Sequence, residues 1–83
     1  MGEIIGYVLI ATEVGQEHEV AKRIWDSPYR EKITDVTVTY GIYDVVVRFD
    51  VDSFAESNDI VTYIRNLPGV KRTETLLGFP VKR

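Results

Sequence analysis

The chain has 83 residues, no cysteine and one histidine, so it has the length of one domain and can form neither a disulfide nor a Cys–His zinc site. Ten Lys and Arg residues against thirteen Asp and Glu give a net charge of −3, which argues against direct nucleic-acid binding, because that requires a basic surface. We expect a single domain over residues 1–83. A chain this short buries only about 60–65% of its unfolded surface, so self-association is expected to add stability.

Neither a secretion signal nor a membrane span is expected. Glu3 lies where a signal peptide would be basic. The apolar run from Ile4 to Thr12 is far shorter than the roughly 20 residues that a membrane helix needs. We therefore expect a cytoplasmic protein with no membrane partner.

The first half of the chain predicts a strand, a helix and a hairpin. Val and Ile total 20 residues against four Leu, which favours strands in the core. The run Ile4–Thr12 predicts a strand that is apolar on both faces. Residues 16–27 have the apolar spacing of an amphipathic helix, which Pro28 ends. Two strands, Ile33–Tyr40 and Tyr43–Val51, are expected to join in a hairpin at Gly41.

The second half predicts a helix and a last strand. Ser53 and Glu56 have the spacing of a capping box at the start of a helix, which Pro68 and Gly69 stop. A strand is expected over Val70–Leu77. The order strand-helix-strand, strand-helix-strand predicts an α+β, ferredoxin-like βαββαβ fold, in which both helices cover one face of a four-stranded antiparallel sheet.

The opposite face of that sheet is expected to be apolar and open. We place Val8, Ile10, Val46 and Arg48 on it, and Tyr43 with Val45, Val47 and Phe49 on the core face. An open apolar sheet face is a surface for a partner, and the expected partner is a second copy packed sheet to sheet. If Arg48 is buried there, it needs an acidic partner such as Asp50, Asp44 or Glu74.

The chain offers little catalytic chemistry. His18 is either a general base or, as we favour, a solvated residue of the first helix. Asp50 and Asp52 are either metal ligands or, as we favour, turn residues before the second helix. No phosphate-binding glycine motif is present. We therefore expect a non-enzymatic protein without a cofactor or metal.

Two other segments have both a structural and a functional interpretation. Gly41 and Asp44 are either ordinary turn residues or a pair that binds both ends of an amino acid, with the Gly41 backbone on the carboxylate and Asp44 on the ammonium. Thr73 and Thr75 share one strand face, and they either favour the strand or offer hydroxyls to a polar ligand.

Three segments together resemble a known family. They are Gly6-Tyr7-Val8-Leu9-Ile10 with Thr12 and Gly15, then Gly41-Ile42-Tyr43-Asp44-Val45-Val46-Val47, and then Ile64 to Val70 with Thr73-Glu74-Thr75-Leu76. In this order and spacing, over nearly the whole chain, they resemble the effector-binding domain of the Lrp/AsnC transcription regulators. This domain is also called RAM, for regulation of amino-acid metabolism.

The resemblance implies a dimer joined through its sheets, rings of dimers that are often octameric, and an amino-acid effector bound in clefts between dimers. By the same resemblance, the ligand-binding residues would be Tyr40, Gly41, Tyr43, Asp44, Thr73 and Thr75. The family regulators carry a helix-turn-helix domain before this one, so we expect a stand-alone version that modulates full-length regulators without touching DNA.

The chain also departs from the family. Tyr40 stands where a small Thr or Ser is common, and its ring would shrink or reshape the cleft; the stretch from Pro28 to Gly41 is also longer than usual. Two other functions stay open: a small dimeric α+β-barrel enzyme, such as a haem or quinone monooxygenase, and a purely structural assembly module.

Overall fold

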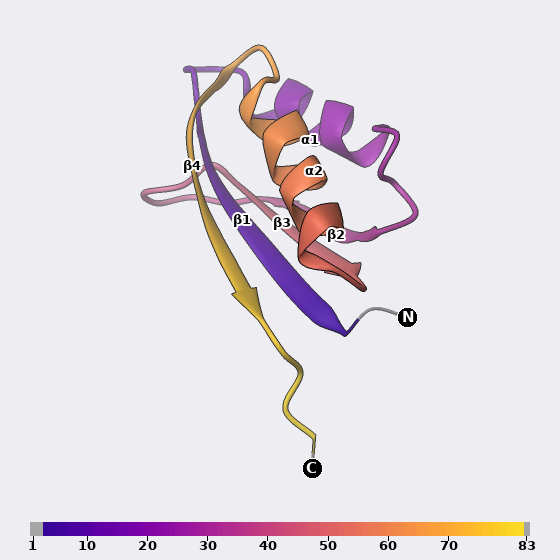
Figure 1. Cartoon of the computed structure of the whole chain (residues 1–83). Helices are drawn as coiled ribbons and strands as arrows, with labels where there is room; N and C mark the ends of the chain where they lie inside the picture. The colour runs from indigo at the N-terminus through magenta and orange to yellow at the C-terminus, as the bar shows by residue number, and fades with distance from the viewer. Residues whose placement is uncertain (1–2, 83) are drawn as a thin grey trace.

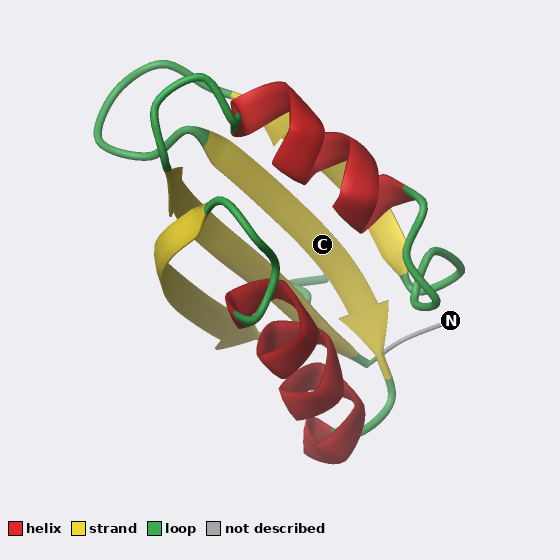
Figure 2. Ribbon diagram, turned by 90° about the horizontal axis from the view of Figure 1, so that it is seen from above, coloured by secondary structure: helices red, strands yellow, loops and turns green. Residues whose placement is uncertain are grey.

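The computed structural model describes residues 3–82, and its elements follow the predicted order (Figure 1). They are β1 (Ile4–Thr12), α1 (Glu17–Trp25), β2 (Ile33–Val38), β3 (Val45–Val51), α2 (Phe54–Arg65) and β4 (Val70–Gly78). The strands form one antiparallel sheet in the order β2-β3-β1-β4. Both helices lie over the same face of this sheet, as Figure 2 shows, so the ferredoxin-like α+β fold is confirmed.

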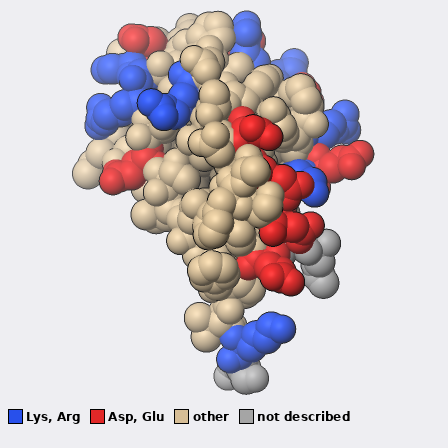
Figure 3. All heavy atoms as spheres, in the orientation of Figure 1, with Lys and Arg blue, Asp and Glu red and all other residues tan. Residues whose placement is uncertain are grey.

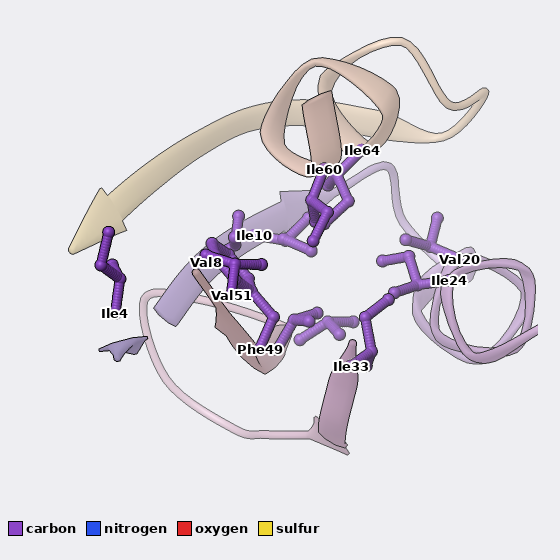
Figure 4. Close-up of a cluster of buried hydrophobic side chains, with 12 residues drawn as sticks. Ile4, Val8, Ile10, Val20, Ile24, Ile33, Phe49, Val51, Ile60 and Ile64 are labelled. Carbon is purple, nitrogen blue, oxygen red and sulfur yellow. The ribbon is translucent and has the colours of Figure 1, made fainter. Parts of the chain in front are cut away.

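The core lies between the helix pair and the sheet (Figure 4). Val20 and Ile24 reach it from α1, and Ile60 and Ile64 from α2. The sheet contributes alternate residues of β1 and β3, because successive side chains of a strand point to opposite faces. These sheet residues are Ile4, Val8 and Ile10 of β1 and Val45, Val47, Phe49 and Val51 of β3.

Gly6 shows why the core face of β1 carries a glycine among its apolar residues. It pairs directly with Phe49 across the β1–β3 ladder. A Cβ atom built on Gly6 would lie 2.0 Å from Cζ of Phe49, far inside contact distance. The aromatic ring therefore occupies the space that any larger residue at position 6 would need.

The prediction that Val8 and Ile10 lie on the open face is wrong. Both side chains are fully buried in the core beneath the helices. Val8 pairs with Val47, and Ile10 pairs with Val45, so register places them on the face opposite Val46. Because β1 is apolar on both faces, its periodicity alone did not show which set the helices cover.

The open face does exist, and the alternate residues of β1 form it. Tyr7 pairs with Arg48 and Leu9 pairs with Val46, which confirms the predicted placement of Val46 and Arg48 on this face. On the other side of β1, Tyr7 pairs with Leu76 of β4. We call this surface the open face: Ile5, Tyr7, Leu9, Val46, Arg48, Asp50, Glu74 and Leu76.

Arg48 has the acidic partner that its position requires. Its Nη2 lies 3.6 Å from Oδ1 of Asp50 on the same strand. Nε of Arg48 and Oδ1 of Asp50 are nevertheless buried without a hydrogen-bond partner among residues 3–82. The open face thus combines apolar side chains with polar atoms whose hydrogen-bonding capacity the described chain leaves unused.

Candidate functional site

The segment between β2 and β3 is a closed turn that projects beyond the sheet (Figure 1). Thr39 donates its backbone N–H to the Asp44 carbonyl at 2.8 Å and its hydroxyl to the Tyr43 carbonyl at 2.8 Å. Gly41 has φ 145°, which lies in the region that favours glycine. Tyr40 is 98% exposed beside it, so the tip presents a bare aromatic ring.

Asp44 ties this turn to the end of β1. Its backbone N–H donates to the Ile10 carbonyl at 2.8 Å. Its Oδ2 accepts the backbone N–H of Thr12 at 2.8 Å and the Thr12 hydroxyl at 3.3 Å. The half-buried carboxylate is therefore held in one orientation by a partner 32 residues earlier in the chain.

The Asp44 carboxylate lines a groove of about 310 Å³ between the β1–α1 turn and the β2–β3 segment. Glu13 and Glu17 also line it, so three of its side chains are acidic, and His18 is the single basic group. Carboxylates arranged in this way suit an ammonium group. We call this the acidic groove: Thr12, Glu13, Val14, Gly15, Glu17, His18, Val38, Thr39, Tyr40 and Asp44.

Tyr43 lies on the open face, and the prediction that it shares the core face with Val45 is wrong. Its hydroxyl donates to Oε1 of Glu74 at 2.5 Å, and the Arg72 guanidinium lies 5.9 Å from the centre of its ring. The hydrogen bond to Glu74 is the main reason why the pKa of Tyr43 is raised above its usual value of 10.0. Strand β3 begins only at Val45, so strand alternation does not extend back to Tyr43.

Thr73 and Thr75 lie on the helix side of the edge strand β4, opposite Ile10 and Val8 of β1. Both line a groove of about 550 Å³ between α2 and β4. We call this the basic groove: Val61, Arg65, Val70, Lys71, Arg72, Thr73 and Thr75. It shares no residue with the acidic groove.

One protomer therefore does not bring the six predicted ligand residues together. Tyr40 and Asp44 share the acidic groove, whereas Thr73 and Thr75 line the basic groove. Thr12 was not among the predicted ligand residues, and the one local signal for it was its position at the end of an apolar strand. The clustering of Arg65 with Lys71 was also not predicted, because it depends on how α2 packs beside β4.

Other kinds of site find little support in the part of the chain that the structure describes. Over residues 3–82, no three His, Asp or Glu side chains gather as a metal site. His18 is exposed and lies at the acidic groove, not between the helices and the sheet. Neither described helix has the length and apolar composition needed to cross a membrane.

The curated proteins that this chain resembles are transcriptional regulators. No protein-family model matches the chain. The HTH-type transcriptional regulator FL11 of Pyrococcus horikoshii is 30% identical over 74 residues, which are 89% of this chain and 47% of the regulator. The FL11 regulator of Pyrococcus furiosus is 29% identical over 80 residues, 96% of this chain and 51% of its own length. The chain thus spans about half the length of the curated regulators it matches.

Solved structures have the same fold. The crystal structure of TTHA0845 from Thermus thermophilus has a TM-score of 0.85 and 32% identity, with 96% of this chain and 98% of that chain covered. Escherichia coli AsnC has a TM-score of 0.76 and 16% identity, with 98% of this chain and 55% of that chain covered. The homologues of this chain are Lrp/AsnC-family regulators, and the chain has the fold of the AsnC effector-binding (RAM) domain.

Proposed function

We propose that this domain binds an amino-acid effector where copies of it meet, and that binding alters the assembly of an Lrp/AsnC-type regulator. The observation that carries the proposal is the Asp44 carboxylate, which Thr12 holds half-buried in the acidic groove. A carboxylate that is already oriented binds an ammonium group at a smaller entropic cost. In this proposal Asp44 takes the ammonium, and the Gly41 backbone takes the carboxylate.

The separation of the two grooves supports a site shared between copies. Thr73 and Thr75 line the basic groove, so within one protomer they do not share a groove with Asp44. A neighbouring copy would present its own threonines to the ligand beside Asp44. The ligand would then stabilise the contact that buries it, because any molecule that binds only the assembled state favours that state.

The open face supports dimerisation sheet to sheet as the first step of assembly. Apolar Tyr7, Leu9 and Val46 lie there around Arg48, whose Nε has no hydrogen-bond partner among the described residues. A second copy would cover the apolar surface and offer acceptors to the arginine. We propose that such dimers join into rings, octamer-like in form, and that they also join full-length regulators.

We propose that the chain acts as one ligand-binding and oligomerisation unit over residues 1–83, without catalysis and without direct DNA contact. The relatives are transcription regulators, which supports a regulatory role in the cytoplasm. The net charge of −3 disfavours binding to a phosphate backbone.

The test is a thermal-shift screen with the twenty amino acids, followed by calorimetry on any ligand that stabilises the protein. We expect at least one stabilising amino acid, and a larger species in sedimentation when that amino acid is present. Asp44→Asn should weaken its binding by about 1.5–3 kcal/mol, because a charged hydrogen bond is lost. The asparagine keeps an oxygen for the Thr12 N–H, so the turn stays anchored.

Asp59→Asn is the matched control, because Asp59 is exposed on α2 and lines neither groove. It should bind the amino acid as the unsubstituted protein does. A screen without any stabilising amino acid would favour a purely structural module. Equal affinities in the two variants would remove Asp44 from the site.

A further inference from the structure

The basic groove concentrates positive charge in a protein whose net charge is negative. Arg65 comes from the last turn of α2, and Lys71 and Arg72 come from the first residues of β4. Figure 3 shows Lys and Arg side chains gathered on the upper left of the molecule, the side on which β4 begins in Figure 1. The Arg72 guanidinium lies over the Tyr43 ring on the opposite face of the sheet, so Arg65 and Lys71 are the two basic side chains left for this groove.

The charges of Arg65 and Lys71 are not neutralised within the described chain. Among residues 3–82, the ion pairs are Arg23 with Glu19, Lys32 with Glu56 and Arg48 with Asp50. Arg65 and Lys71 have no carboxylate within 4.0 Å among the described residues. Their charges are therefore available to an anion from solution.

The groove also offers neutral donors and an apolar wall. Thr73 and Thr75 are half-buried, and their hydroxyls form no side-chain hydrogen bond within residues 3–82. Val61 and Val70 line the same space. At about 550 Å³, the groove has the size of typical small-molecule sites.

We propose that the basic groove binds a small dianion, either a dicarboxylate or a phosphate-bearing molecule. One anionic group satisfies the Arg65 guanidinium fork in a bidentate manner, and a second is needed to use the Lys71 ammonium. The threonine hydroxyls donate to the same oxygens. This inference goes beyond the proposed function, because it assigns an acidic ligand to Arg65 and Lys71, which the proposed amino-acid site does not use; the two proposals share Thr73 and Thr75.

The test is a titration followed by amide NMR at constant ionic strength, with succinate and inorganic phosphate as probes and acetate as the monoanion. Either dianion should produce saturable shifts at Thr73 and Thr75, whereas acetate should not. Saturation by succinate alone identifies a dicarboxylate site, and saturation by phosphate alone identifies a phosphate site. If neither dianion saturates these signals, the proposal is wrong.

Arg65→Gln and Lys71→Gln should each weaken binding of the effective dianion about tenfold or more, since each removes a charge-assisted hydrogen bond. Arg30→Gln is the matched control, because Arg30 is exposed and lines neither groove. Equal losses in all three variants would indicate general screening and overturn the proposal. Asp44→Asn should leave dianion binding unchanged. The experiment therefore tests the dianion proposal independently of the proposed amino-acid site.

Discussion

At the scale of single residues, Gly6 is the described glycine at which an added Cβ would meet the closest neighbouring atom. Gly6→Ala should lower the free energy of unfolding by about 1–3 kcal/mol, because the added methyl forces the Phe49 ring to move within a packed core. Urea unfolding monitored by circular dichroism measures the change. Gly78→Ala is the control, since a Cβ there has open space around it. Equal stability of the two variants would contradict the close contact between Gly6 and the Phe49 ring.

The residues of the turn show where sequence reasoning about the site succeeds and where it fails. Gly41 was predicted at the hairpin tip, and its φ of 145° confirms a conformation that suits glycine. Tyr43 was placed on the wrong face, because alternation was extended through a segment that is not a strand. The bond from Thr12 to Asp44 joins positions 32 residues apart, and no local pattern predicts it.

At the scale of elements, the start of α2 carries a capping box that depends on pH. Ser53 Oγ accepts the Glu56 N–H at 3.2 Å, and Glu56 Oε1 accepts the Asp52 N–H at 2.8 Å. The bond from Asp52 is the main reason why the pKa of Glu56 is lowered from 4.5, and Lys32 at 3.3 Å lowers it further. A lowered folded-state pKa means that the carboxylate stabilises the fold above the unfolded value and loses this contribution as pH falls through the folded value.

Glu56→Gln should therefore make stability less dependent on pH below the ordinary glutamate pKa of 4.5, where the carboxylate of the unsubstituted protein takes up its proton. The urea midpoint measured across this range tests the expectation. Glu31→Gln is the control, because Glu31 is exposed and forms no ion pair among the described residues. In the Glu31 variant, the urea midpoint should change with pH as steeply as it does in the unsubstituted protein. An equally steep change in the Glu56 variant would contradict the prediction.

The order of elements was predictable because their boundaries carry local chemical signals. Pro28, the Ser53 capping box and the Pro68-Gly69 pair mark the ends of helices, and strand β1 has its predicted bounds. Which face of β1 packs against the helices was not predictable, since the side chains on both of its faces are apolar. Pairing with β3 decides it, and that pairing is a contact between distant parts of the chain.

At the scale of the whole molecule, the open face makes a prediction about assembly. Val46→Glu should shift the proposed dimer toward the monomer, because a buried charge without a partner opposes sheet-to-sheet packing. Sedimentation at micromolar concentration measures the shift. Phe54→Glu places the same charge at an exposed apolar position on α2 and should leave the dimer intact. A monomeric unsubstituted protein, or equal association of both variants, would count against dimerisation through this face.

The central place of β1 in the sheet has a consequence for how the chain folds during synthesis. Strand β1 is synthesised before both of its neighbours, β3 and β4, which end at residues 51 and 78. Its pairing with both neighbours cannot be completed until β4 has been translated to residue 78. Until β4 is available to pair, the nascent β1 segment is apolar on both faces and unpaired on one edge. During this interval it is most exposed to chaperones and to aggregation.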